Sequence, residues 1–418
     1  MASLASRLLK CERHELAAVV WSFAYFFLLL CSYYLLRPVR DSLAVEAGAQ
    51  ALQWLFTATF IAMLALVPVF GWLCQRLSRA RLLPVVYGFF ALNLVAFVFF
   101  LDGRVFFVWL SVFNLFVVSV FWSFMSDLFD SGQAARLYGA IAAGGSCGAI
   151  AGPLLAASLV PMVQTKGLLI LSALLLFATV ACILQLARWS QAHPRQGEPR
   201  AEAPIGGGVL DGVRMALASP FLLAICGYLF CYTALSTALY FQQVEIVRVA
   251  VPDLNERTRL FATLDLAVNV LTLLVQLFAF ARLGPLLGIT GLLIVMPLVS
   301  LAGFLWLGAA PTLAALIVFG VTRRVGEFAI SKPARETLFT AVPRNDRYKA
   351  KNFIDTVVYR GGDALSGWFF GSLGAIVAIA AGLSLAWAAL AVYLGNKMNS
   401  WTRVGAPSSP RSQPERSR

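Results

Sequence analysis

Three charged side chains lie inside an apolar run near residue 325. The run FGVTRRVGEFAI contains Arg323, Arg324 and Glu327. A helix that began at Pro311 and stopped before the arginines would have only 12 residues, and roughly 20 are needed to cross a bilayer. The helix must therefore continue past them to about residue 331, which places the charges inside the membrane. Charged residues in such positions mark substrate or ion pathways and pair with one another.

The spacing of these charges predicts a local ion pair beside a polar cavity. Glu327 is four residues from Arg323 and three from Arg324, so one carboxylate can neighbour both guanidinium groups. We expect Glu327 to lie between them as their counter-ion. Adjacent side chains diverge by about 100° around a helix, so both arginines avoid lipid only if the helix borders a polar cavity.

Charged residues recur in other apolar segments. The segment KNFIDTVVYRGGDALSG places Arg360 three residues before Asp363, at the spacing of a helical ion pair. The remaining candidates are Asp355 in the same segment, Asp265, and the group Arg37, Arg40 and Asp41 that ends the first apolar run. That last group has an interfacial alternative, because arginine side chains snorkel easily. Together the five arginines and five acids are neutral, so composition alone does not decide the substrate's charge, although arginine favours bidentate recognition of carboxylate or phosphate.

Apolar helices must position these charges. The 418-residue chain is 60% hydrophobic and 13% charged, with a mean hydropathy of +0.80, whereas about 25% of a soluble domain is charged. The sequence predicts an all-α membrane protein with twelve transmembrane helices in two six-helix pseudo-repeats. The predicted spans are 16–36, 54–74, 83–101, 105–126, 137–160, 167–187, 220–241, 258–281, 285–307, 311–331, 352–372 and 375–396.

A polar stretch rich in proline and glycine divides the spans into six and six. We expect an N-terminal half at 1–187, a cytoplasmic linker at 188–219, a C-terminal half at 220–396 and a cytoplasmic tail at 397–418. With the N-terminus in the cytoplasm, cytoplasmic segments hold 23 lysines and arginines and the opposite loops hold 7. This asymmetry predicts cytoplasmic termini, in a multi-pass protein of a bacterial inner membrane.

The sequence gives little support to other functional classes. The net charge of +13 lies mostly in loops and the tail, so it is read as a topology signal and not as a nucleic-acid surface. The seven cysteines form no C-x-x-C pair, and the two histidines lie in polar segments, so we expect no metal site or cofactor. The chain also lacks a P-loop and a recognisable nucleophile–base pair, so we do not expect an enzyme.

Two segments resemble those of major facilitator transporters. The loop GWLCQRLSRAR is similar to the loop signature of that superfamily at Gly71, Leu73, Arg76 and Arg79, with Gln75 and Ser78 as departures. The alternative is an ordinary basic loop. In GGSCGAIAGP, Gly144, Gly148 and Gly152 share one helix face, which suits either close helix packing or a hinge.

Three longer segments resemble the ATP/ADP translocases of intracellular bacteria and plastids. They are LLRPVRDSLAV, QAARLYGAIAAGG and KPARETLFTAVPRNDRYKAKNFIDTVVYRGG. Charged positions of the family match Arg37, Arg40, Asp41, Arg335, Glu336, Lys351, Asp355 and Arg360. The chain departs from the nucleotide carriers at Gln133, Tyr240 and Asp363 and is shorter, so the resemblance implies a related transporter without securing ATP and ADP as substrates.

We therefore expect a secondary transporter that works by alternating access, with its site between the halves. Its partners would be membrane lipid and an anionic or phosphorylated solute such as ATP or ADP. The predicted substrate contacts are Arg37, Arg40, Arg323, Arg324, Lys351 and Arg360, and the charge-pairing or coupling residues are Asp41, Asp265, Glu327, Glu336, Asp355 and Asp363. The alternatives are transport of a drug, sugar or amino acid, or a non-transporting scaffold or sensor.

Overall fold

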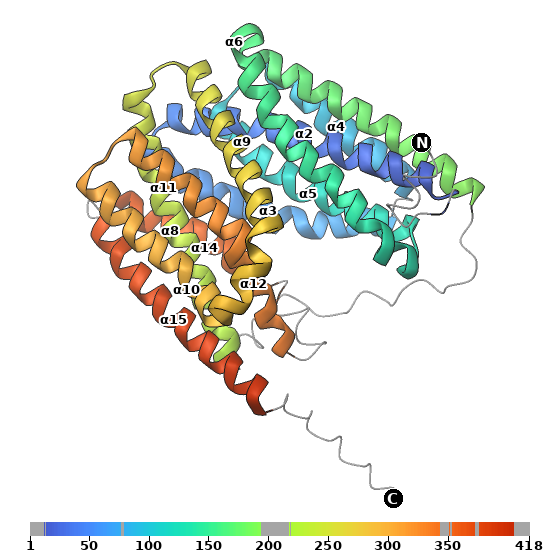
Figure 1. The fold of residues 1–418 in the computed structure, drawn as a ribbon. Coiled ribbons are helices and arrows are strands. Elements are labelled where there is room, and N and C mark those ends of the chain that lie inside the picture. Colours follow the sequence, from blue (N-terminus) through green and yellow to red (C-terminus); the bar gives the residue numbers. More distant parts are fainter. Residues whose placement is uncertain are drawn as a thin grey trace, which may run out of the picture.

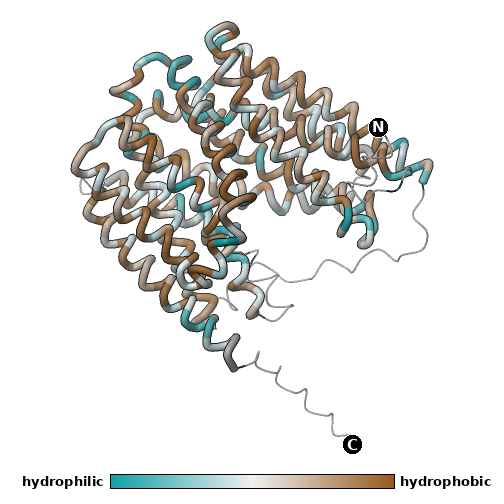
Figure 2. Tube along the Cα trace, viewed as in Figure 1, coloured by the Kyte–Doolittle hydropathy of each residue, from teal (hydrophilic) through white to brown (hydrophobic). Residues whose placement is uncertain are grey.

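The computed structural model describes residues 12, 14–76, 79–193, 217, 219–342, 351, 353–372 and 376–404, and these residues are almost entirely helical (Figure 1). Most of the predicted linker and the tail beyond residue 404 lie outside this part, as does Ser78 of the loop signature. Hydrophobic residues cover most of each helix, and hydrophilic residues gather at several helix ends (Figure 2).

The N-terminal half contains six membrane-length segments in five continuous helices. They are α2 (Leu16–Ala47), α3 (Ala49–Arg76), α4 (Arg79–Phe99), α5 (Gly103–Leu128) and α6 (Ser131–Ala192). The 62-residue α6 is two helices joined at a kink, where Gln164 has a φ of 57°. The last helix of this half therefore ends five residues beyond the predicted boundary at 187.

The C-terminal half has the same number of segments, two of which contain a π-helical turn. Its first helices are α8 (Pro220–Ala250), α9 (Leu254–Phe278) and α10 (Phe280–Ala309). Next come α11 (Leu313–Gly326), the π-turn η1 (Glu327–Ser331), α12 (Lys332–Leu338) and the short 3₁₀ turn η2 (Phe339–Ala341). The π-turn η3 (Ile354–Val358), α14 (Tyr359–Ser372) and α15 (Ile376–Val404) complete the half. Among the described residues, eight helices are long and apolar enough to cross a membrane, and α6 contributes two crossings. With α4 and the two interrupted segments, the prediction of twelve segments in an all-α membrane fold is confirmed.

The first helix corrects one expectation. The sequence predicts that span 1 ends near residue 36, and for Arg37, Arg40 and Asp41 it leaves an interfacial position as the alternative to a role in the site. Instead α2 continues to Ala47 and contains all three residues, and Asp41 is only 6% exposed. The helix therefore does not end where the sequence predicts, because neighbouring helices supply polar partners that allow it to continue through these charges.

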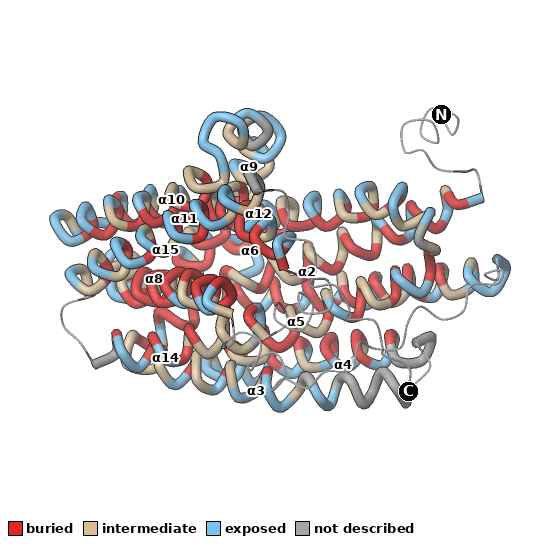
Figure 3. The backbone as a smooth tube through the Cα atoms, turned by 90° about the horizontal axis from the view of Figure 1, so that it is seen from below, coloured by how far each residue is buried: buried red, intermediate tan, exposed pale blue. Residues whose placement is uncertain are grey.

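Glycines allow the first half to pack tightly around α2. A Cβ atom added at Gly144 would lie 2.5 Å from the backbone oxygen of Phe23, and one at Gly152 would lie 2.6 Å from that of Cys31. Side chains at these positions would force α2 and α6 apart. The structure therefore supports the packing interpretation of the glycine stripe, and buried residues fill the space between helices while exposed residues cover the outer faces (Figure 3).

Gln133 helps to join the beginnings of α6 and α2. Its side chain completes the capping box of α6 with Asp130 and donates a 2.8 Å hydrogen bond to Glu15. Arg136 adds an ion pair of 3.0 Å to the same carboxylate. Burial by itself would raise the pKa of Glu15, but hydrogen bonds from the Glu12 backbone, Gln133 and Arg136 lower it. The departure at position 133 is thus a structural contact in this chain.

The two halves meet at one end and diverge toward the other (Figure 1). At the joined end, Thr258 donates a 2.9 Å hydrogen bond to Ser42, and the backbone and hydroxyl of Thr165 each lie 3.1 Å from Asn255 Oδ1. Trp368 of α14 donates to Thr57 of α3 at 2.9 Å. These contacts lie near the α2–α3 and α8–α9 junctions and the kink of α6. The described chain ends lie at the opposite, diverging end of the halves.

Candidate functional site

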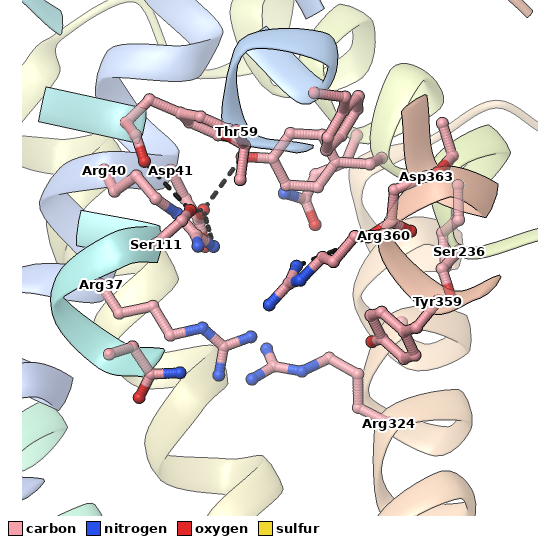
Figure 4. Close-up of a pocket in the computed structure, with 18 of the residues that line it drawn as sticks. Arg37, Arg40, Asp41, Thr59, Ser111, Ser236, Arg324, Tyr359, Arg360 and Asp363 are labelled. Carbon is pink, nitrogen blue, oxygen red and sulfur yellow. Dashed lines mark hydrogen bonds and ion pairs between the residues drawn. The ribbon is translucent and has the colours of Figure 1, made fainter. Parts of the chain in front are cut away.

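A cavity of about 470 Å³ lies between the two halves (Figure 4). Helices α2, α3 and α5 line it from one half, and α8, α11 and α14 line it from the other. Its lining includes all five predicted intramembrane arginines and two of the predicted acids, namely Arg37, Arg40, Arg323, Arg324, Arg360, Asp41 and Asp363. Residues that the sequence distributes over three helices, α2, α11 and α14, therefore meet in one place.

Asp265 links two arginines from different halves. Its Oδ1 accepts a 2.6 Å hydrogen bond from Arg324 and lies 3.6 Å from Arg37 Nη1. Asp265 belongs to α9 and is only 1% exposed. Its Oδ2 is buried without a hydrogen-bond partner among the described residues. One carboxylate thus holds two guanidinium groups at the cavity and ties the halves together.

A second pair lies at the joined end of the cavity. Arg40 donates to Asp41 Oδ1 through both Nε and Nη2, at 2.9 and 2.7 Å. Tyr240 of α8 donates to the same oxygen at 2.9 Å, so this pair also bridges the halves. The sequence comparison marked Tyr240 only as a departure from the nucleotide carriers. Its polar tip within an apolar run was the signal that it needs a buried partner.

Arg360 forms the pair that its helical spacing predicts. Its Nη1 lies 3.5 Å from Asp363, three residues further along α14. The guanidinium group also lies over the ring of Tyr359, 5.2 Å from the centroid. Arg37, Arg324 and Arg360 point toward one another in the cavity (Figure 4). Three guanidinium groups from both halves therefore face a common space.

Arg323 has partners that the sequence did not predict. It is 4% exposed and donates to the backbone oxygen of Tyr232 at 3.0 Å and to Ser300 at 3.3 Å. Its guanidinium carbon lies 5.1 Å from the centroid of the Tyr232 ring. In the part of the chain that the structure describes, Arg323 forms no ion pair with a carboxylate. It therefore fixes one wall of the cavity within the C-terminal half.

The predicted pairing of Glu327 with Arg323 and Arg324 is wrong. Glu327 is 4% exposed and pairs with Arg335 at 3.9 Å, two turns further along the segment. The helix is regular between Arg323 and Glu327, whose backbone N–H bonds to the Arg323 oxygen, so it is the polar partners on other helices that draw the two arginines away. The π-turn η1 begins at Glu327 and changes the register only of the residues that follow, Arg335 among them. Such turns occur often at functional sites. Arg324 is paired with Asp265 across the cavity wall instead.

The remaining predicted residues lie away from the cavity. Lys351 pairs with Glu336, and neither lines the cavity between the halves. Asp355 lies in η3, is exposed and is also absent from the lining. Lys351 is therefore not placed as a substrate contact, because its charge is satisfied by a neighbour outside the site.

The local charge balance differs from the neutral total of the sequence. Five arginines line the cavity, while the carboxylates in or against it are Asp41, Asp363 and Asp265. This leaves an excess of two positive charges, because Glu327 and Asp355 are placed elsewhere. The lining is also aromatic, with Tyr33, Tyr34, Phe56, Phe107, Tyr232, Tyr240 and Tyr359. The arrangement suits a small anion that carries a ring, through charge-assisted hydrogen bonds and contacts with aromatic faces.

Comparisons with known proteins agree with this architecture. The family model described as Major Facilitator Superfamily matches residues 22–362, so the chain belongs to that superfamily and is a membrane-embedded secondary transporter of a small-molecule solute. No curated protein matches the chain. Neither finding tests the resemblance to ATP/ADP translocases, which stays a prediction.

Solved structures of transporters share the fold at low sequence identity. An inward-facing, unoccupied bacterial homologue of the human lysosomal transporter Spinster has a TM-score of 0.60 and 15% identity, covering 96% of this chain and 99% of that one. The nucleoside transporter NupG has a TM-score of 0.63 and 12% identity, covering 94% and 100%. A bacterial homologue of the iron transporter ferroportin, also inward-facing, has a TM-score of 0.63 and 13% identity, covering 92% and 98%.

Proposed function

We propose that this protein transports a small organic anion, most favourably a phosphorylated one, by alternating access. The observation that carries the proposal is the convergence of Arg37, Arg324 and Arg360 on one cavity between the halves. Guanidinium groups donate paired hydrogen bonds to phosphate or carboxylate, in a planar geometry that a lysine ammonium lacks. Because the cavity has an excess of two positive charges, an anion can bind there without a cation that accompanies it.

The contacts of Asp265 suggest how an anion would enter. Without cargo, its single carboxylate is the shared counter-ion of Arg37 and Arg324. An incoming phosphate would replace this carboxylate as the partner of both arginines. For the joined end to open, Arg37 must separate from Asp265, and Asp41 from Tyr240. Cargo binding would therefore act on one of the contacts that hold the halves in this conformation.

The dimensions and aromatic lining narrow the class of cargo. A volume of about 470 Å³ lies within the ~300–1,000 Å³ of small-molecule sites. Aromatic faces from both halves suit stacking with a planar ring. A nucleotide combines such a ring with phosphate, and the resemblance to ATP/ADP translocases supports the same class. Transport of a neutral solute is the second candidate, favoured by the internal pairing of Arg40 with Asp41.

Transport measurements test this proposal. Purified protein in proteoliposomes is assayed with labelled inorganic phosphate, AMP and ADP, and with uridine and an organic amine as neutral and cationic comparisons. We expect uptake of at least one phosphorylated compound. Arg360→Lys keeps the charge and should reduce that uptake at least ten-fold, whereas Arg282→Lys, exposed on α10, should have no effect. Uptake of uridine alone, or of the amine alone, would contradict the anionic cargo, as would a failure to take up any of the phosphorylated compounds.

Accessibility of the arginine positions gives an independent test. A cysteine that replaces Arg324 or Arg360 should react with a polar thiol reagent, because both positions line the cavity. Added ADP should slow this reaction. A cysteine at either position that is protected by uridine and not by any phosphorylated compound would favour the neutral cargo.

We also propose that the protein lies in a bacterial inner membrane with both termini in the cytoplasm. The charge asymmetry of the loops supports this topology. Reporter fusions at Gln196 and Arg411 should both give a cytoplasmic signal, and a fusion at Thr165 should give a periplasmic one. With this topology, the diverging end of the two halves faces the cytoplasm. A periplasmic signal at Gln196 would reverse the assignment.

A further inference from the structure

A second cavity lies on the outer surface of the N-terminal half, among α3, α4 and α5. Its volume is about 790 Å³, and among the described residues that line it Arg104 is the charged one. Several lining residues are strongly exposed, including Trp54 at 60% and Phe89 at 59%, so the cavity is a groove that faces lipid. It uses other faces of α3 and α5 than the cavity between the halves, which is lined by Phe56 and Phe107.

The groove has the length of one membrane leaflet. Arg104 is the second residue of α5, and Phe116 lies 12 residues further along it. At 1.5 Å per residue the two are separated by about 18 Å along the helix. One leaflet contributes about 15 Å to the hydrocarbon core. On α3, the small residues Ala58 and Ala62 line the groove one turn apart, where they leave space for a chain.

Two polar groups of the groove bear on what it can bind. Arg104 is exposed; the Asp102 carboxylate at the start of the same helix acts on it electrostatically, but the two form no ion pair within 4 Å, so the guanidinium group stays open to a headgroup. The Nε1–H of Trp109 is buried and has no hydrogen-bond acceptor among the described residues. Trp109 lies five residues beyond Arg104, about 7 Å deeper along α5. An orphaned donor in an apolar environment is costly, so an acceptor on a bound molecule would stabilise it.

We propose that this groove is a binding site for an anionic phospholipid of the leaflet next to the α4–α5 loop. Arg104 binds the phosphate-bearing headgroup at the membrane surface. The Trp109 side chain lies at the depth where the acyl chains begin, and its Nε1–H, buried without an acceptor among the described residues, turns outward to donate to an ester carbonyl when the lipid binds. One acyl chain fills the apolar groove toward Phe116. The order of cation, hydrogen-bond donor and apolar channel matches the order of groups along such a lipid.

The test uses full-length protein in nanodiscs with a phospholipid that carries a photoreactive diazirine in its acyl chain. The same probe is prepared with a phosphatidylglycerol and with a phosphatidylcholine headgroup, and labelled peptides are mapped by mass spectrometry. We expect labelling of the α5 face at Val108 and Val112, about five-fold stronger for phosphatidylglycerol, as the contribution of one basic residue near an anionic lipid predicts.

Three substitutions separate a built site from ordinary contact with bulk lipid. Arg104→Gln should reduce phosphatidylglycerol labelling about five-fold, and Trp109→Phe, which keeps the ring but loses the donor, should reduce it by a similar factor. Ala62→Leu should block labelling with both headgroups. Arg259→Gln, an exposed basic residue near the start of α9 outside the groove, is the matched control and should have no effect.

Either of two results would overturn the proposal. One is labelling spread evenly over the outer helices, and the other is groove labelling that depends on neither the headgroup nor Arg104. Because Arg104 is exposed, its substitution tests the proposal even if Ala62→Leu fails to fold. Free phosphate is distinguished by competition, since excess inorganic phosphate should not displace the lipid probe.

Discussion

Replacing Asp265 by asparagine should lower the stability of the protein without cargo and increase its affinity for an anion. The substitution keeps the shape of the side chain and one hydrogen-bond acceptor but removes the charge. Asp265 contacts Arg324 at 2.6 Å and Arg37 at 3.6 Å, and its side chain is 2% exposed. Stability should fall because the carboxylate holds the halves together. Anion affinity should rise because the same carboxylate competes with cargo for the two arginines.

The magnitude follows from the geometry of these contacts. Hydrogen bonds to charged groups contribute about 1.5–3 kcal/mol and are roughly twice as strong as neutral ones. The Arg324 and Arg37 side chains are 26% and 18% exposed, so water in the cavity takes over part of the lost interaction. We therefore expect the free energy of unfolding of the protein without cargo to fall by about 1–2 kcal/mol, which corresponds to a factor of roughly 5–30 in an equilibrium constant.

The assay compares thermal unfolding and ligand binding of the purified variant with those of the original protein. The Tm without ligand should fall by a few degrees, while the Kd for ADP should decrease by roughly 5–30-fold, the same factor. Glu256→Gln, an exposed carboxylate on the first turn of α9, is the control and should change neither value. An unchanged Tm together with unchanged or weaker ADP binding would refute the competition between Asp265 and cargo.

Three further predictions concern other contacts of the structure. Glu327→Ala should destabilise the protein by about 3–5 kcal/mol, because it leaves Arg335 buried without its ion-pair partner. Adding Arg335→Ala should restore part of the lost Tm. A double variant that is no more stable than the single one would count against the pair. Tyr240→Phe should lower the stability of the contact between the halves by about 1–3 kcal/mol, because it deletes the hydrogen bond to Asp41. Thiol labelling of a cysteine near the joined end should then become faster. Unchanged labelling would show that this bond does not hold the halves together. The pKa of Glu15 is lowered in the folded state, so its contribution to stability is present above about pH 4.3 and is lost as the pH falls through the lowered pKa. Glu15→Gln should therefore flatten the acid side of a plot of Tm against pH. An unaltered plot would argue against this linkage.

The sequence by itself determined the helices and which of them carry charge. Apolar length fixes the number of crossings, because a shorter segment cannot span the bilayer. The same argument placed Arg323 and Arg324 inside the membrane, and α11 with its continuation through η1 and α12 confirms that the helical segment runs past them. The pair of Arg360 with Asp363 was also predictable, since residues three apart on a helix are neighbours whatever surrounds them.

Only the tertiary structure decided which charges meet between helices. Arg324 is paired with Asp265, which is 59 residues away, and Tyr240 with Asp41, which is 199 residues away. Such pairs depend on how each helix is rotated and where it crosses its neighbours, and side-chain packing over the whole half sets both. Glu327 keeps the regular helical spacing to Arg323, yet it pairs with Arg335, because Arg324 finds Asp265 on α9 and Arg323 finds polar groups on α8 and α10. The positive charge of the cavity likewise follows from placement, because Glu327 and Asp355 are held away from it while all five arginines face it.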